Sequence, residues 1–214
     1  MPILLLVRHG ENDYSRAHRL AGRLPGVHLN ERGKRQAEAL AAALAGIPLR
    51  AVYSSPLERT LETARPIAKA HNLQPVRLAG LIEADVGTWQ GKYIRRLALT
   101  KAWRAIQQAP SRARHPAGEG ILAVQERVAS AMELICRRHG RRDVVACVTH
   151  ADLIKLAVAH FIGLPLDRFQ RLGCDTGSVT ALYVGDLGAT LLRLNLLPPF
   201  ELGLGSRGRA RPAS

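Results

Sequence analysis

Residues 4–12, Leu-Leu-Leu-Val-Arg-His-Gly-Glu-Asn, decide the fold predicted for this 214-residue chain. An uninterrupted apolar run of this length is typical of a strand buried on both faces of a mostly parallel sheet. The run ends at Arg8 and His9, and open α/β sheets bind ligands outside the carboxyl ends of their strands. Gly10 allows a turn or the close approach of a ligand there. The stretch therefore predicts an α/β protein with Arg8 and His9 at its ligand-binding edge.

An adjacent Arg and His are suited to phosphate chemistry. A guanidinium group binds phosphate oxygens through paired N–H groups. A neutral imidazole can attack phosphorus as a nucleophile. The alternative is a solvated Arg8 and a structural His9 at a strand end, and the pair by itself favours that alternative. Motifs further along the chain are needed to choose between the two.

The composition predicts one domain that binds anions. The chain is 47% hydrophobic, which is enough for a substantial core, and it carries 31 Lys and Arg against 17 Asp and Glu, a formal net charge of +14. Such a charge favours anionic ligands and nonspecific adhesion to nucleic acid. Aromatic residues are only 4% of the chain, and stacking on single-stranded bases requires them. We expect a domain over residues 1–197, a flexible basic C-terminal tail over residues 198–214, and no specific nucleic-acid partner.

The cysteines and the N-terminus predict a cytoplasmic protein. Cys136, Cys147 and Cys174 are odd in number and far apart, so neither a disulfide framework nor a zinc site is indicated. The N-terminal apolar run is too short to span a membrane, and Arg8 interrupts it before any signal-peptidase site. We therefore expect reduced thiols, no membrane association and no bound metal.

Strands and helices alternate along the chain. The apolar periodicity predicts helices over residues 30–45, 55–71, 92–108, 121–139 and 151–161, and strands over residues 4–7, 51–54, 76–78, 143–149, 178–184 and 191–195. Residues 109–120 contain Pro and Gly, and we expect them to form a mobile linker.

Arg59 is predicted to lie beside an anion site. Ser55 as N-cap, Pro56 at the first helical position and Glu58 three residues after the cap fit a capping box. Arg59 would then lie in the first turn of the helix, where unpaired backbone N–H groups favour an anion. The alternative for Arg59 is an ordinary surface position.

Two later stretches supply an acid and a second histidine. Residues 81–91 form a loop that contains Glu83 and Asp85. An acid that donates a proton near neutral pH must be desolvated or lie beside a negative charge, whereas a loop acid is otherwise simply solvated. Residues 143–149 are a second apolar strand, which ends at His150 before a helix. A lone His in that place is more often structural.

Four stretches together resemble the histidine phosphatase superfamily, the phosphoglycerate-mutase-like proteins. They are Leu-Val-Arg-His-Gly-Glu at residues 6–11, Ser-Ser-Pro-Leu-Glu-Arg-Thr at 54–60, the loop at 81–91, and Val-Thr-His-Ala-Asp-Leu-Ile-Lys at 148–155. The resemblance runs in family order from about residue 3 to residue 195. It implies a three-layer α/β/α sandwich with a mostly parallel central sheet. It also implies a phosphomonoester hydrolase that acts through a phosphohistidine intermediate on a small phosphorylated metabolite.

The resemblance also implies a catalytic role for each matched residue. His9 attacks phosphorus and becomes the phosphohistidine. Glu83 donates a proton to the leaving group and then activates water, with Asp85 as the less favoured candidate. The phosphate oxygens are held by Arg8, Arg59 and His150. The scheme requires neither a metal nor a cofactor.

One segment departs from the family pattern. Many members carry Asn at the position of Ser15 and Gln near the position of Ala21. Ser15 can still donate a hydrogen bond, but from a shorter side chain, which affects substrate choice more than the basic chemistry. The phosphate-binding set implied by the resemblance is completed by Ser15, Arg19, Gly22 and Ala151.

Two other functions stay open. A cofactor-dependent phosphoglycerate mutase is disfavoured because the segment between Glu83 and His150 is short for a mutase. A non-catalytic anion- or nucleic-acid-binding protein on this scaffold is disfavoured because the basic residues are scattered and the catalytic set is complete. The expected partner is a small phosphorylated substrate, and a homodimer is compatible with the sequence.

Overall fold

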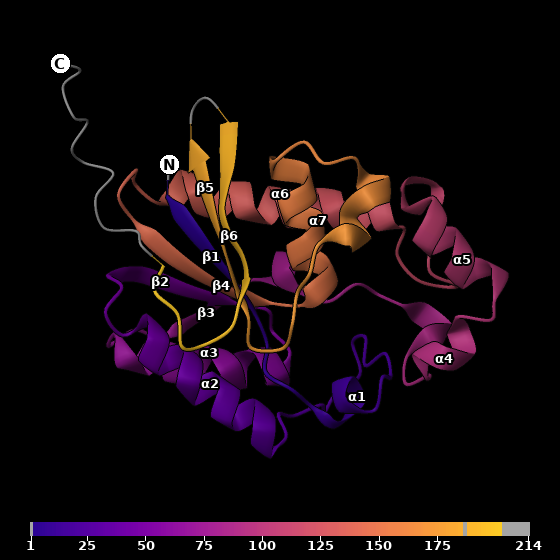
Figure 1. The fold of residues 1–214 in the computed structure, drawn as a ribbon, viewed down its shortest axis with the longest axis horizontal. Helices are drawn as coiled ribbons and strands as arrows, with labels where there is room; N and C mark the ends of the chain where they lie inside the picture. The colour runs from indigo at the N-terminus through magenta and orange to yellow at the C-terminus, as the bar shows by residue number, and fades with distance from the viewer. Residues whose placement is uncertain (1, 186–187, 203–214) are drawn as a thin grey trace.

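The central strand β1 organises a six-stranded mixed sheet (Figure 1). The structure is a computed structural model that describes residues 2–185 and 188–202. The strands are β1 (Ile3–Arg8), β2 (Leu49–Ser54), β3 (Pro75–Arg77), β4 (Val144–Thr149), β5 (Val179–Gly185) and β6 (Gly188–Leu196), in the spatial order β3-β2-β4-β1-β5-β6. The pairs β1–β4, β2–β4 and β2–β3 are parallel, and β5 and β6 add antiparallel strands at one side.

Helices cover both faces of this sheet, so the predicted three-layer α/β/α sandwich is confirmed (Figure 1). Leu4 and Leu6 pack on the face of α6 (Ile121–Arg138) and α7 (Ala151–Phe161). Leu5 and Val7 pack on the opposite face, under α2 (Glu31–Leu44) and α3 (Glu58–Ala70). All four side chains are fully buried. Burial on both faces explains why the sequence of β1 has no polar alternation.

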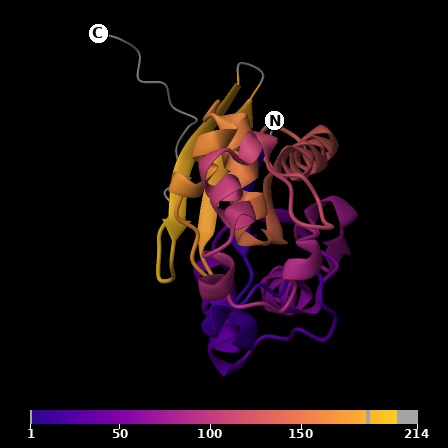
Figure 2. The same cartoon turned by 90° about the vertical axis from the view of Figure 1, so that its right-hand side faces the viewer.

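Short elements complete the fold. They are α1 (Asp13–Arg16), α4 (Ile94–Leu97) and α5 (Lys101–Gln108), with the 3₁₀ turns η1 (Ala79–Leu81), η2 (Gly87–Trp89), η3 (Pro110–Arg112) and η4 (Leu166–Arg171). Figure 1 shows α1, α4 and α5 together on one side of the molecule, and Figure 2 shows β5 and β6 along an edge of it.

The predicted capping box at Ser55 is wrong. Helix α3 begins three residues later, at Glu58, and Leu57 in its N-cap position keeps an extended backbone. The Ser55 hydroxyl instead lies 2.9 Å from Nε2 of His150. The Glu58 carboxylate accepts a hydrogen bond from the backbone N–H of Gly26 at 3.1 Å. Tertiary partners therefore take both side chains that the local pattern assigned to a cap.

The predicted single helix over residues 92–108 is also wrong, because α4 ends at Leu97 and α5 begins at Lys101. Thr100 separates them: its hydroxyl accepts from the N–H of Trp103 at 3.2 Å and caps α5. A Thr N-cap satisfies one of the free N–H groups of a new helix. Residues 109–120 contain η3 and an antiparallel bridge between Arg114 and Gly120, and their mobility stays a prediction.

The C-terminal part of the described chain packs on the core. Strand β6 is longer than the predicted 191–195. Leu202 is 3% exposed and lies in the cluster under α2 and α3. The rest of the predicted tail, residues 203–214, lies outside the described residues. Within the described residues, no helix combines the length and the apolar character needed to cross a membrane.

Candidate active site

Parallel pairing of β1 and β4 brings the two histidines together. Arg8 is in register with Thr149, and the residues that follow them, His9 and His150, leave the sheet side by side. The backbone N–H of His9 donates to the carbonyl of Thr149 at 3.1 Å. The two imidazole ring centres are 5.2 Å apart. The repeated strand-then-histidine layout of the sequence thus produces one site at the carboxyl edge of the sheet.

His9 presents an unprotonated nitrogen to this site. Its Nδ1 lies 2.7 Å from the carbonyl oxygen of Gly10. A carbonyl can only accept a hydrogen bond, so Nδ1 carries the proton and Nε2 carries the lone pair. Burial, and then the charges of Arg59 and Arg8, hold the pKa of His9 well below its usual range. His9 is therefore neutral at physiological pH, as a nucleophile must be.

Gly10 is required by close packing. A Cβ atom at this position would lie 2.5 Å from the carbonyl oxygen of Gly33, in the first turn of α2. The backbone N–H of Gly10 donates to the hydroxyl of Thr63 on α3 at 3.0 Å. The turn that orients His9 is thus held between the two helices of one layer.

Two arginines supply N–H groups to the same site. Arg59 is 1% exposed, and its Nη2 donates to the carbonyl of Gly22 at 2.8 Å. Nη1 of Arg8 donates to the carbonyl of Cys174 at 2.6 Å. Among the described residues, Nε and Nη1 of Arg59 and Nε of Arg8 are buried and have no hydrogen-bond partner. Buried charged donors require a partner, and a phosphate group offers oxygens with the matching charge and geometry.

His150 is neutral, and its ring is held by two neighbours. Nη2 of Arg59 lies 3.4 Å from its Nδ1, and because Arg can only donate, Nδ1 accepts and the proton lies on Nε2. Nε2 then donates to the hydroxyl of Ser55 at 2.9 Å. Burial, and then Arg59, His9 and Arg8, hold the pKa of His150 well below its usual range.

Ser55 is a site residue that the sequence reasoning missed. It is fully buried, and its hydroxyl fixes the ring of His150. The Ser-Ser-Pro motif was the available signal, but its local capping pattern pointed elsewhere.

Glu83 can serve as a proton donor near neutral pH. Its Oε2 lies 3.5 Å from Nδ1 of His150, and its side chain is 20% exposed. Burial, and then repulsion from Asp152, raise its pKa to about 7, although Arg59 acts in the opposite direction. The contact therefore joins a neutral imidazole to a carboxyl group that is partly protonated. The Asp85 carboxylate instead accepts from the N–H of Gly87 at 2.9 Å in its own loop, which favours Glu83 as the acid.

The remaining predicted residues have other contacts. The Ser15 hydroxyl exchanges hydrogen bonds with the backbone of Asn12, at 2.9 and 3.0 Å, and caps α1. Arg19 donates from Nε to the carbonyl of Gly91 at 2.8 Å and stacks on the ring of Tyr14. Ala151 is the first residue of α7. The phosphate-binding roles of Ser15, Arg19 and Ala151 stay predictions, whereas Gly22 orients Arg59 through its carbonyl oxygen.

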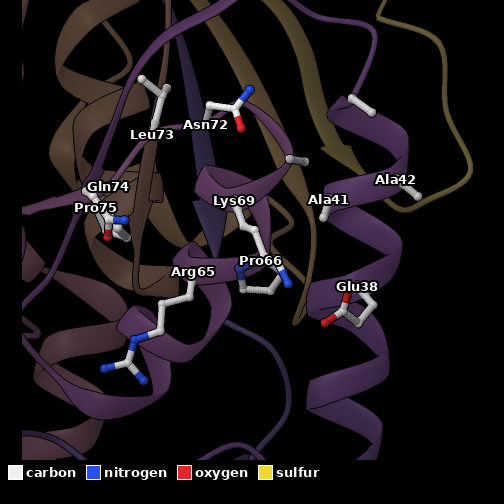
Figure 3. Close-up of a pocket in the computed structure, with 12 residues that line it drawn as sticks. Glu38, Ala41, Ala42, Arg65, Pro66, Lys69, Asn72, Leu73, Gln74 and Pro75 are labelled. Atoms are coloured by element: carbon white, nitrogen blue, oxygen red, sulfur yellow. The ribbon is translucent and has the colours of Figure 1, made fainter.

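A separate hollow of about 1000 Å³ lies between α2 and α3, away from His9 and His150. Figure 3 shows Glu38 and Ala41 of α2 on one side of it and Pro66 and Lys69 of α3 on the other. Its lining includes none of the predicted site residues. The hollow is therefore distinct from the phosphate site.

Comparisons with known proteins identify the family of the chain. The sequence pattern of the histidine phosphatase superfamily (branch 1) matches residues 4–197. The chain is 33% identical over 195 residues to phosphoserine phosphatase 1 of Hydrogenobacter thermophilus, covering 90% of this chain and 92% of the relative. It is 31% identical to a 2,3-bisphosphoglycerate-dependent phosphoglycerate mutase of Thermoplasma acidophilum, covering 86% and 88%. The solved structure of a mycobacterial glucosyl-3-phosphoglycerate phosphatase with VO3 superposes with a TM-score of 0.82 at 27% identity, covering 91% and 99%.

Proposed function

The chain belongs to the histidine phosphatase superfamily and is a phosphatase of small phosphorylated metabolites, and we propose that it works through a phosphohistidine at His9. The observation that carries this mechanism is the neutral His9, with its Nε2 lone pair free, beside the buried and unpartnered N–H groups of Arg59 and Arg8. A nucleophile and an anion site therefore share one edge of the sheet.

In the first step, the Nε2 lone pair of His9 attacks phosphorus and the bond from phosphorus to the ester oxygen breaks. Arg8 and Arg59 hold the phosphoryl oxygens, and the guanidinium charges stabilise the charge of the transition state. His150 can donate to a phosphoryl oxygen only if the bound phosphate displaces Ser55 from its Nε2–H. The Glu83 carboxyl gives its proton to the departing oxygen. The products of this step are an alcohol, a phosphohistidine and a Glu83 carboxylate.

In the second step, the Glu83 carboxylate removes a proton from water as the water oxygen attacks phosphorus. The phosphorus–nitrogen bond breaks and its electron pair returns to Nε2 of His9. Inorganic phosphate leaves, and Glu83 is protonated again. Every step uses side chains of this protein, and we propose that turnover requires neither a metal nor a cofactor.

The first candidate substrates follow from the relatives. Their names refer to phosphoserine, phosphoglycerate and glucosyl-3-phosphoglycerate, which are small phosphate esters that also carry a carboxylate. The +14 net charge of the chain favours such polyanions. We propose that the substrate is a small ester of this kind. We also propose a cytoplasmic location, which the three free, buried cysteines support.

A phosphoglycerate mutase is the second candidate, and the archaeal relative of that name supports it. A mutase must keep its phosphoenzyme away from water, whereas a phosphatase hydrolyses it. The two functions share the chemistry of His9 and differ only in the fate of the phosphohistidine.

The test is hydrolysis of a panel of phosphate monoesters in the presence of EDTA, with His9→Ala as the control. The panel contains phosphoserine, an aryl phosphate, and 3-phosphoglycerate with and without 2,3-bisphosphoglycerate. We expect release of inorganic phosphate by the wild type and none by His9→Ala. Isomerisation of 3-phosphoglycerate without net phosphate release would identify a mutase. Hydrolysis that survives in His9→Ala would refute the phosphohistidine mechanism.

A further inference from the structure

Glu119 lies between Arg23 and Arg127, and both arginines also bind the loop over residues 81–91 that carries Glu83. Its Oε2 accepts from Nη2 of Arg23 at 2.9 Å and from Nη2 of Arg127 at 3.0 Å, and its Oε1 accepts from Nε of Arg127 at 3.2 Å. The three side chains are 23–29% exposed. Because the side chains are partly buried and the contact of Arg127 with Glu119 is bidentate, this cluster is stronger than an exposed surface ion pair.

The two arginines bind the backbone on both sides of the proposed acid. Nε of Arg23 donates to the carbonyl of Glu83 itself at 2.8 Å. Nη1 of Arg127 donates to the carbonyl of Ile82 at 2.8 Å and to that of Gly80 at 3.0 Å. The carboxylate of Glu119 thus fixes two guanidinium groups whose other N–H groups fix the loop.

Glu119 also binds this loop directly. Its Oε2 accepts from the N–H of Asp85 at 2.8 Å, and its own N–H donates to the carbonyl of Asp85 at 2.8 Å. A Cβ atom at Gly118 would lie 2.2 Å from the Asp85 carbonyl oxygen. The backbones of the two segments are therefore in tight contact just beyond the proposed acid.

We propose that Glu119 is a positioning residue for general-acid catalysis: through Arg23, Arg127 and the Asp85 N–H, it holds the Glu83 carboxyl where it can reach the leaving oxygen. The proposal rests on the proposed function, since it assumes that Glu83 is the acid. Glu119 contacts no reacting atom, so it acts only through the position of Glu83. A misplaced donor loses most of its effect because proton transfer requires hydrogen-bond distance.

The test is Glu119→Gln, with Glu133→Gln as the matched control. Glu133 lies on α6 and makes an exposed contact with Arg137 at 3.7 Å, so its replacement removes the same charge from an exposed site. Each variant is assayed with an aryl phosphate, which has a good leaving group, and with phosphoserine, which has a poor one. Glu119→Gln should lower kcat for the poor leaving group about tenfold, with a much smaller effect on the good one and on KM. Glu133→Gln should behave as the wild type.

Two further variants separate positioning from general damage. In a Glu83→Gln background, Glu119→Gln should cause no further loss with the poor leaving group, because the donor is already gone. Arg127→Lys keeps the charge but cannot bind Glu119 and both carbonyls together, so it should reproduce the leaving-group effect even if Glu119→Gln fails to fold.

The positioning role would be overturned if Glu119→Gln slowed both substrates equally. It would also be overturned if the losses in kcat caused by Glu119→Gln and Glu83→Gln were fully additive in the double variant. If Glu83→Gln itself does not discriminate between leaving groups, the proposed acid is wrong, and the proposal for Glu119 falls with it. If Glu83→Gln discriminates and neither Glu119→Gln nor Arg127→Lys does, only the positioning role is refuted.

Discussion

Replacement of Glu83 by Gln should stabilise the folded protein at high pH while it impairs catalysis. Burial raises the pKa of Glu83 from 4.5 to about 7, so ionisation of this side chain is less favourable in the folded chain than in the unfolded one. Below pH 4.5 both states hold the proton. Between about 4.5 and 7 the unfolded chain releases it first, so stability falls as pH rises through this window and then levels off.

The expected change in the free energy of unfolding follows from the pKa shift of Glu83. A pKa displaced by about 2.5 units corresponds to about 3 kcal/mol, of which about 2 to 3 kcal/mol is lost between about pH 5 and pH 8. Glutamine has no proton to release. The unfolding free energy of Glu83→Gln relative to the wild type should therefore rise by that amount over this pH range. His9 and His150 are common to both proteins, so their titration largely cancels in the difference.

The assay is urea unfolding of the wild type, Glu83→Gln and the exposed-site control Glu133→Gln at about pH 5 and at about pH 8. The slopes m are compared to verify that each transition exposes a similar amount of surface. A difference between wild type and Glu83→Gln that is the same at both pH values would refute the argument, because it would show that the pKa of Glu83 is not raised by folding. The control should show no comparable dependence on pH.

Four further predictions concern the nucleophile, the acid and the packing of the chain. His9→Ala should lower turnover by at least about 10³-fold, and no radiolabelled phosphate should be trapped on the denatured enzyme. For a poor leaving group, kcat/KM should fall as pH rises through about 7, where Glu83 loses its proton; persistence of that decline in Glu83→Gln would assign it to another group. Gly10→Ala should cost about 1–3 kcal/mol of unfolding free energy, because its Cβ would lie 2.5 Å from a carbonyl oxygen of α2, whereas Gly46→Ala meets no atom within 4 Å and should be nearly neutral in urea unfolding. Leu202→Ala should cost about 2–5 kcal/mol because this side chain is in the core; an unchanged midpoint in urea would place the end of the folded domain before it.

The predicted helix cap at Ser55 and the observed cap at Thr100 show how local sequence signals can differ from the final structure. At Ser55, Pro56 and Glu58 every local preference agreed with a cap, yet His150 and the N–H of Gly26 bind the two polar side chains. A hydrogen bond to a buried histidine outweighs a helix cap that water can replace, because a buried polar group without a partner is costly. At Thr100 the cap residue is present in the sequence, but the helical periodicity continues on both sides of it and hides the break between α4 and α5.

The sequence by itself determined the layers of the fold and the place of the reactive groups. Short apolar runs bounded by turn signals are consistent with buried strands, and His9 and His150 directly follow two such strands. The resemblance to the histidine phosphatase superfamily is what predicted both histidines and Arg8 as one site, and the parallel pairing of β1 and β4 places the two histidines at one edge.

Only the tertiary structure decided the proton positions, the pKa of Glu83 and the support of its loop. Each depends on groups that are distant in the sequence: the Glu119 carboxylate meets Arg23, 96 residues away, and Ser55 meets His150, 95 residues away. The sequence gives no signal for such pairs, because the periodicity of a helix or strand relates only residues that are close in the sequence. Their energies also depend on burial, which is a property of the packed molecule and not of any one segment.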